Sequence, residues 1–446
     1  MARRDILTEI YSSFEPFLPP PEGAYIDCRD VRGGWDVIKE LGKRIERSSY
    51  PTCQLYTGHR GVGKSTELVR LKKHLEGRGY FVVYFAVDSG DIEPQDTEYA
   101  DILLACTRHL IESIQLSAAE NPLLNWMKER WKSLKELALT EVKFEDLKLE
   151  QQIAQFGKIT ANLRAVPDIR RKIRQELNQN TVSLIDAMNE FIVEAQKSLS
   201  AEYNGLVLMA DSLDRIVEQT RETGNGKTAT NYDEIFLTRS ELLKGLKCHA
   251  IYTLPISMIY SHRFSQLEDN YSRPDVLPMI MVRDRSNKAN PPGIEKLRKL
   301  VYKRIEVIDA ELAQNLTTKV FDCPDTLDRM CCMSGGHVRI LMQLMQGAID
   351  QIDVLPITSD AMQIAIEEGR DVYRRSVYDR EWKLLAQVAQ TKQITIDDDH
   401  LHFLLDRYVL EYRYYDEKKR LQRWYDVHPL MEEIEKFQKA LEEVNR

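Results

Sequence analysis

The sequence predicts an α/β fold in which a parallel sheet carries a phosphate-binding loop and is followed by an all-α lid and a C-terminal winged helix. Three observations lead to this prediction. The stretch from Gly58 to Ser65 has the spacing Gly-x-x-x-x-Gly-Lys-Ser between an apolar run and a helical pattern. Other short apolar runs end in polar residues, as buried parallel strands do. The last segment, 379–446, combines two helical patterns with two β-rich runs.

Composition bounds the class of protein. A chain of 446 residues holds about two to four domains. Its net charge of −8 argues against wholesale polyanion binding but allows a local basic patch. The seven cysteines show no Cys-x-x-Cys spacing. Their odd number and the apolar runs around several of them are typical of reduced thiols in a cytoplasm. No apolar run approaches the ~20 residues of a membrane span, and the N-terminus has no apolar signal core. We therefore expect a cytoplasmic protein with no membrane contact.

The phosphate-binding loop supplies the central functional prediction. Its candidate nucleotide-binding residues are consecutive: Gly58, His59, Arg60, Gly61, Val62, Gly63, Lys64, Ser65 and Thr66. Glycines let successive backbone N–H groups turn inward, and the following helix N-terminus favours negative charge. Lys64 can reach the β- and γ-phosphates of ATP, and the Ser65 hydroxyl can ligate Mg²⁺. The sequence thus predicts ATP or ADP with Mg²⁺ as ligands.

The chain on either side of this loop predicts further helices and strands. Residues 1–24 predict a short helix and a stiff proline link. A helix is expected over 27–47; its Arg29 and Arg32 lie near the base or phosphates in one interpretation and are solvated surface charge in the other. The apolar run 80–87 predicts a central strand.

A long helical stretch follows, from Tyr99 to about Ser200. Because this length exceeds one crossover connection, we expect a crossover helix plus a helical insertion at about 116–180. Within it, the segment 158–174 carries six bases against one acid. This segment is either a patch for a partner or nucleic acid, or a solvated helix face.

Two later strands place the candidate catalytic residues. Asp211 ends an apolar run, at the edge of the sheet where ligands bind in open α/β folds. It is a candidate Mg²⁺ ligand, and Asp214 a candidate to polarise the attacking water; a helix N-cap is the structural alternative. Thr253 ends the next run and either touches the γ-phosphate or forms a strand-end turn before Pro255. A fifth strand is expected over 276–282.

The remaining chain predicts two further parts. With the core at 25–292, the helical lid spans 293–378 and the winged helix 379–446. The last part has 12 bases and 15 acids, and the helix that would enter DNA begins with three aspartates, Asp397 to Asp399. Because that is the wrong sign for phosphate, we interpret the module as protein-facing or nucleotide-sensing. Basic residues of its hairpin keep a DNA role open: Lys418, Lys419, Arg420 and Arg423.

This order of motifs resembles the STAND branch of the AAA+-like P-loop ATPases, which includes the NACHT and NB-ARC families. The resemblance covers about residues 25–435. It implies a five-stranded parallel P-loop NTPase sheet in AAA+-like order. A small residue, Ser212, follows Asp211, and an acid returns at Asp214, as in NACHT proteins. Most AAA+ machines have Glu at the place of Ser212.

Two further motifs extend the resemblance. Ser334 to Arg339 looks like the Gly-rich lid motif, so Arg339 stands where a sensor arginine would reach the γ-phosphate; the alternative is a surface arginine. Val427-His428-Pro429 is similar to the Met-His-Asp motif of NB-ARC proteins, whose His contacts the β-phosphate of ADP. That role would fall on His428, although Pro429 replaces the Asp.

The resemblance implies an ATP-driven switch, closed with ADP and open with ATP. Lys64, Asp211, Asp214 and Thr253 would be catalytic, with Ser65 and Asp211 on the metal, and the absence of Glu at 212 predicts slow hydrolysis. The partner would be a separate effector or sensor protein, or further copies of the chain, in prokaryotic signalling or defence. The alternatives are a DNA-binding AAA+ initiator or loader, and a nucleotide-bound scaffold without hydrolysis.

Overall fold

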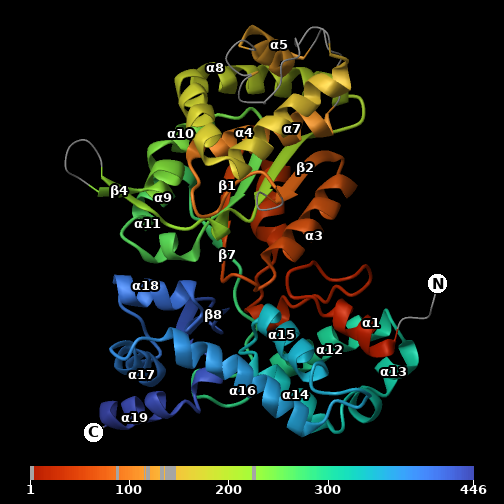
Figure 1. The fold of residues 1–446 in the computed structure, drawn as a ribbon, viewed down its shortest axis with the longest axis vertical. Helices are drawn as coiled ribbons and strands as arrows, with labels where there is room; N and C mark the ends of the chain where they lie inside the picture. Colours follow the sequence, from red (N-terminus) through yellow and green to blue (C-terminus); the bar gives the residue numbers. More distant parts are fainter. Residues whose placement is uncertain are drawn as a thin grey trace. The chain divides into compact units, whose positions relative to one another are not determined.

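The computed structural model describes residues 5–86, 90–114, 116, 121–130, 135, 147–222 and 228–445. Its contacts divide the chain into two units (Figure 1). We call Val37–Thr57 with Glu67–Asp275 the sheet unit, and Met1–Asp36, Gly58–Thr66 and Val276–Arg446 the lid-wing unit. The phosphate-binding loop therefore groups with the lid and the C-terminal segment, although it follows directly on a strand of the sheet.

The sheet has the strand order β2-β3-β6-β1-β7. The strands are β1 (Cys53–Thr57), β2 (Tyr80–Ala86), β3 (Gly205–Asp211), β6 (His249–Thr253) and β7 (Asp275–Val276). The pairs β2/β3, β3/β6 and β1/β6 are parallel. Apolar residues fill both faces of β3, which lies between β2 and β6, and its residues Leu206 to Ala210 are all buried. This confirms the predicted α/β class and the AAA+-like order.

Two predicted strands have different bounds. The run expected over 80–87 is a strand up to Ala86, and Val87 lies outside the described residues. The fifth strand was expected over 276–282 but occupies only Asp275–Val276, so that prediction is wrong beyond Val276. Pro278 has no N–H to donate to a sheet, and the Met281 N–H is instead bonded to the Val31 carbonyl, 3.1 Å away.

The helices of the sheet unit include α4 (Tyr99–Ser113), α5 (Pro122–Glu129), α7 (Leu149–Ala165) and α8 (Pro167–Leu199). Among them, α4 packs on β2 and α8 on β3, while α5 and α7 pack on these helices (Figure 1). The insertion was expected to end near 180, yet α8 continues without a break to Leu199. Residues 117–120, 131–134 and 136–146 of that predicted insertion lie outside the described residues.

The basic segment 158–174 is divided between interior and surface. Arg170 and Arg174 are buried and pair with Asp96, at 2.8 and 2.9 Å, and Arg174 also pairs with Asp101 at 2.6 Å. These two arginines therefore join α8 to the start of α4 and do not present charge to a partner. The exposed bases of the segment are Lys158, Arg164, Arg171 and Lys172.

The lid-wing unit begins with α1 (Ile6–Ser13), which packs on the lid. Arg304 of α12 donates to the Ser13 carbonyl, and the Ser13 hydroxyl donates to the Arg304 carbonyl at 3.1 Å. The lid helices are α12 (Pro291–Glu306), α13 (Ala310–Gln314), α14 (Pro324–Met333), α15 (Val338–Ile349) and α16 (Ser359–Ser376). Apart from the first two residues of α12, these helices fall within the segment 293–378 that was predicted as the lid.

The C-terminal segment has the elements predicted for a winged helix. They are α17 (Glu381–Thr391), α18 (Asp398–Leu405) and the antiparallel strands β8 (Val409–Tyr415) and β9 (Leu421–Val427). A further helix, α19 (Glu435–Val444), follows the hairpin and was not predicted. We call β8, β9 and the turn between them the wing hairpin. Stacking of Tyr412 on Trp424, with ring centroids 4.3 Å apart, joins its two strands.

The helix predicted over 27–47 is interrupted, so that prediction is wrong in part. A short turn, Asp30–Arg32, ends at Gly33, and helical structure resumes only from Ile38 to Arg47. Gly33 has a φ of 66°, and a Cβ on it would lie 2.6 Å from the Arg413 carbonyl of β8. Glycine favours this left-handed conformation, and only a residue without a Cβ allows this close contact with the wing hairpin.

Candidate functional site

The phosphate-binding loop has the backbone that its glycines predict. Gly58, Gly61 and Gly63 have φ values of 149°, 87° and 107°, which side chains other than hydrogen disfavour. Lys64 begins α3 (Lys64–Gly77) and is 5% exposed. Its ammonium curls back over the loop and donates to the Gly58 and His59 carbonyls, at 2.9 and 3.0 Å. The loop, the buried cation and the helix N-terminus together fit a phosphate chain.

His59 connects the loop to the C-terminal segment. The ring is 2% exposed, with Nδ1 3.1 Å from the Leu404 carbonyl and Nε2 accepting the Glu411 N–H at 3.0 Å. Because Nε2 accepts, the proton sits on Nδ1, which donates to Leu404. Burial, with a smaller effect of Lys64, lowers the pKa of His59 to about 3, so the ring is neutral. It therefore bridges α18 and β8 from within the loop.

The next two loop residues are bonded to the lid. His337 caps α15, where its Nδ1 accepts the Ile340 N–H at 3.3 Å and its Nε2 donates to the Arg60 carbonyl at 2.6 Å. The Arg339 N–H donates to the Gly61 carbonyl at 3.1 Å. A Cβ on Gly61 would lie 2.6 Å from the His337 ring and 2.7 Å from the Arg339 Cβ. Gly61 is thus required by lid packing as well as by its φ.

The side chain of Arg339 has partners in the N-terminal link. Its Nε donates to the Pro16 carbonyl at 3.2 Å, and its guanidinium lies 5.0 Å from the centroid of the Phe17 ring. Arg339 is half-buried, so it is neither fully exposed nor part of the core. Its role as a γ-phosphate sensor stays a prediction.

His428 is fully buried beside lid helix α16. Its Nδ1 accepts the Leu430 N–H at 3.2 Å, and its ring stacks on Tyr373 with centroids 5.2 Å apart. Burial, assisted by Arg283, lowers the pKa of His428 to about 3. The ring thereby joins the end of the wing hairpin to the lid, and its predicted contact with a β-phosphate stays a prediction.

In the sheet unit, the candidate catalytic residues gather at the carboxyl ends of β3 and β6. Asp211 is buried, and its Oδ2 accepts the Tyr84 hydroxyl at 2.8 Å. The Thr253 hydroxyl accepts the Leu213 N–H at 2.9 Å, which ties the end of β6 to the turn carrying Asp214. Thr253 therefore positions this turn. Whether it also touches a phosphate stays a prediction.

The carboxylates suit a hard cation, which takes oxygen ligands. Asp211 and Asp214 are both buried, and Ser212 between them adopts a left-handed φ of 66° that turns the chain sharply. The Ser65 hydroxyl, in the first turn of α3, is half-buried. The metal-binding roles of Ser65 and Asp211 stay predictions.

Sequence reasoning missed three connections of the loop. The sequence predicted His59 only as a loop residue, predicted no role for His337, and allowed two interpretations of Arg32. Only for Arg32 was a signal present, since a base upstream of the first strand was already a candidate for the nucleotide. The partners of His59 are more than 340 residues away, and no local pattern marks them.

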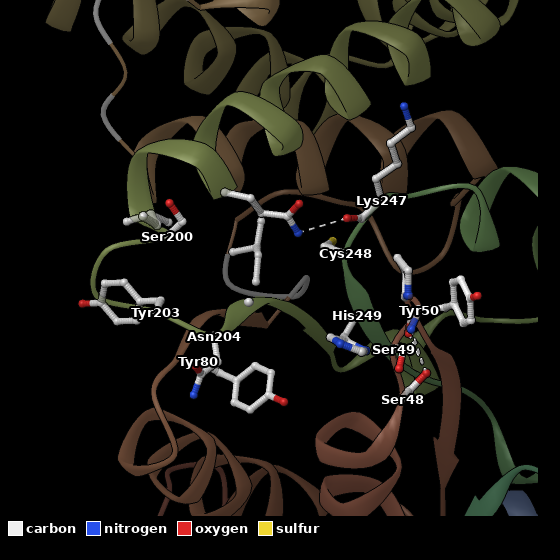
Figure 2. Close-up of a pocket in the computed structure, with 15 residues that line it drawn as sticks. Ser48, Ser49, Tyr50, Tyr80, Ser200, Tyr203, Asn204, Lys247, Cys248 and His249 are labelled. Atoms are coloured by element: carbon white, nitrogen blue, oxygen red, sulfur yellow. Dashed lines mark hydrogen bonds between the residues drawn. The ribbon is translucent and has the colours of Figure 1, made fainter.

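A separate cavity of about 480 Å³ lies at the opposite, amino-terminal edge of the sheet (Figure 2). It is lined by the residues that open β2, β3 and β6: Tyr80, Gly205 and His249. The His249 Nδ1 accepts the Thr52 N–H at 3.1 Å, and the His249 ring packs edge-on against Tyr80. This cavity includes none of the predicted site residues.

Comparisons with known proteins add context. No family model and no curated protein matches the sequence. ORC1 of Aeropyrum pernix, solved in complex with DNA, is 12% identical with a TM-score of 0.38, covering 95% of this chain and 94% of that chain. The ADP form of Aeropyrum pernix ORC2 is 10% identical with a TM-score of 0.41, covering 97% and 96%. Cdc6p from Pyrobaculum aerophilum is 11% identical with a TM-score of 0.40, covering 98% of each chain.

Of these three structures, the first is a complex with DNA and the second an ADP form, and none of them confirms the STAND assignment. At identities and TM-scores this low, the likeness carries no argument about what this chain does. Among the described residues, no helix has both the length and the apolar composition needed to cross a bilayer.

Proposed function

We propose that this chain is a P-loop ATPase of AAA+ type whose lid and winged helix respond to the nucleotide on the phosphate-binding loop. Its ligands are ATP and ADP with Mg²⁺. Three left-handed glycines, the buried Lys64 and the start of α3 support nucleotide binding. Hydrolysis, slower than about 1 s⁻¹, is expected because Ser212 stands where most AAA+ machines have Glu.

One observation carries the coupling part of the proposal. Three consecutive loop residues, His59, Arg60 and Gly61, are each bonded to α18 and β8 or to the lid. A buried hydrogen bond contributes about 1 kcal/mol, and leaving one of its groups unpaired costs more. A change in loop conformation therefore cannot occur without changing these contacts.

Lys64 is the element that senses the ligand. Its ammonium donates to the Gly58 and His59 carbonyls, and the phosphates of a nucleotide offer it stronger, charged acceptors. Transfer of the Lys64 bonds to phosphate would release the carbonyl of His59, whose ring is held by Leu404 and Glu411. In the sheet unit, Asp211 is our proposed metal ligand and Asp214 our proposed water-polarising group; Ser65 is the proposed hydroxyl ligand on the loop.

The test is hydrogen exchange of the segment 404–411 in the purified protein with ADP, with a non-hydrolysable ATP analogue, and without nucleotide. We expect the two nucleotides to protect this segment to different degrees. Lys64→Ala should weaken ADP binding about 100-fold, because a charged hydrogen-bond set contributes about 2–3 kcal/mol. Lys73→Ala, which removes an exposed lysine of the same helix, is the matched control. Equal protection of the segment 404–411 by both nucleotides would contradict the proposed coupling. Unchanged ADP binding by the Lys64→Ala variant would contradict nucleotide binding at the loop.

A second candidate function is a DNA-binding initiator or loader, and the tip of the wing hairpin favours it. Lys418, Lys419 and Arg420 are all exposed there, whereas α18 begins with the acidic residues 397–399. DNA contact would therefore run through the hairpin tip. We expect a gel shift that weakens steeply with salt and is reduced by the triple alanine variant of the tip. Lys299→Ala, an exposed lid lysine, serves as control; unchanged DNA binding by the triple variant would exclude the tip.

The switch interpretation remains the other way to use the same ATPase. In it, the ADP state is closed and the ATP state open, and a separate effector or sensor protein, or further copies of this chain, receives the change. Gel filtration of the wild-type protein with ADP and with an ATP analogue tests whether further copies of this chain receive the change. A larger oligomer with the ATP analogue but not with ADP would support the switch. A protein that stays monomeric with both nucleotides and binds DNA in the gel-shift assay would favour the initiator or loader.

A further inference from the structure

Arg32 lies against the phosphate-binding loop. It ends the short turn Asp30–Arg32, and its side chain is 5% exposed. Its Nη2 donates to the Val62 carbonyl at 2.7 Å and would lie 3.6 Å from a Cβ on Gly63. The guanidinium is therefore next to the two residues that immediately precede Lys64. Arg32 and the loop both belong to the lid-wing unit.

This buried cation is incompletely paired. Among the described residues, its Nε and Nη1 have no hydrogen-bond partner, and no carboxylate forms an ion pair with it. Nearby Arg29 shows the ordinary arrangement, half exposed and paired with Asp27 and Asp36 at 2.5 and 3.0 Å. Burying a charge without its acceptors is unfavourable, so such a group calls for an explanation, and a ligand that supplies the acceptors is one.

The position of Arg32 is also fixed from two sides. The carbonyl of the preceding Val31 accepts the Met281 N–H at 3.1 Å, and the following Gly33 packs against the Arg413 backbone of β8. Because the backbone on both sides is held, the guanidinium is presented to the loop without an ordering step. Preorganised donors of this kind are the ones that bind anions most effectively.

We propose that Arg32 is a nucleotide-binding residue, whose unpaired nitrogens donate to phosphate oxygens of the nucleotide on the loop. This rests on the proposed function, because it needs a nucleotide there. The geometry that carries it is the contact with Val62 together with two unsatisfied, buried donors. A purely structural arginine would instead use its side chain only to hold the N-terminal turn against the loop.

The two roles predict opposite changes in the nucleotide-free protein. If Arg32 serves the ligand, Arg32→Met removes an uncompensated charge, so the unfolding temperature without nucleotide stays equal or rises. ADP affinity then falls about tenfold or more, the effect of losing charge-assisted hydrogen bonds. If Arg32 is structural, the same variant lowers the unfolding temperature and leaves ADP affinity unchanged.

The experiment measures ADP binding by calorimetry and unfolding temperature with and without ADP. Arg285→Met, which removes an exposed loop arginine of the same unit, is the matched control and should leave both unchanged. Arg32→Lys keeps the charge but loses the planar donor set, so its ADP affinity should lie between those of the wild type and Arg32→Met. This second variant keeps the test valid if Arg32→Met fails to fold.

Two negative results have different meanings. Normal ADP affinity in Arg32→Met and in Arg32→Lys would overturn the assignment of Arg32 and leave the proposed function intact. Absence of ADP binding by the wild-type protein would overturn the proposed function itself, and with it the ligand of Arg32.

Discussion

The two units hold their candidate residues in different ways. In the sheet unit, Asp211, Asp214 and Thr253 lie at the ends of two adjacent strands, β3 and β6, and hydrogen bonds between those strand ends position them. In the lid-wing unit, loop residues 59–62 are held by α18, β8, α15 and the turn Asp30–Arg32.

This difference indicates which of the two units can pass a conformational change from the nucleotide site to other elements. A strand-end turn held by its neighbouring strand has little reason to move, because its partners are part of the same sheet. A loop whose consecutive residues are bonded to separate helices and to a hairpin cannot move alone. Four substitutions or conditions test this contrast, in order of decreasing expected effect.

Gly61→Ala should have the largest effect. The added Cβ would meet the His337 ring and the Arg339 Cβ at 2.6 and 2.7 Å, at a φ of 87°. Overpacking and the unfavourable φ together cost about 3 kcal/mol. Chemical unfolding should show this loss. Gly77→Ala, where nothing lies within 4 Å of the added Cβ, is the control and should change stability by much less.

His59→Ala should loosen the wing. It leaves the Leu404 carbonyl and the Glu411 N–H without their partner, at a cost of about 2 kcal/mol. We expect faster hydrogen exchange over 404–411, while the strands of the sheet unit keep their protection. An equal effect on β3 and β6 would show that the two units do not differ as described.

Lowering the pH should destabilise the packing around His59, and also that around His428. The pKa values of His59 and His428 are lowered to about 3 in the folded protein, against 6.5 for an unperturbed ring. The unfolded chain therefore binds more protons between those values, so the stabilisation is complete above about pH 6.5 and falls as the pH drops. Below about pH 6.5, each of the two rings lowers the free energy of unfolding by about 1.4 kcal/mol per pH unit.

Urea unfolding between pH 7.5 and 5.5 measures this pH effect. His59→Gln should make the dependence shallower, because one titrating ring is removed. His262→Gln, which changes an exposed histidine of the sheet unit, should leave the slope as it is. A wild-type stability that is flat over this range would contradict the neutral buried rings.

Thr253→Val should have the smallest effect and a local one. It leaves the buried Leu213 N–H without its acceptor, at a cost of about 1 kcal/mol. Displacement of the Asp214 turn should slow hydrolysis while ADP affinity stays within about twofold of the wild type, since the nucleotide is bound by the loop. Equal losses in both measurements would mean that Thr253 contacts the nucleotide itself.

The sequence by itself predicted the elements whose signals are local. Each of these signals lies within a short window of the sequence, so backbone conformation and burial follow from neighbouring residues. They are the Gly-x-x-x-x-Gly-Lys-Ser spacing, the apolar runs ending at Asp211 and Thr253, and the hairpin after α18. Only the tertiary structure decided how the loop is held. Arg32 meets Val62 across 30 residues and His59 meets Glu411 across 352, and pairings at such separations depend on packing that no local pattern encodes.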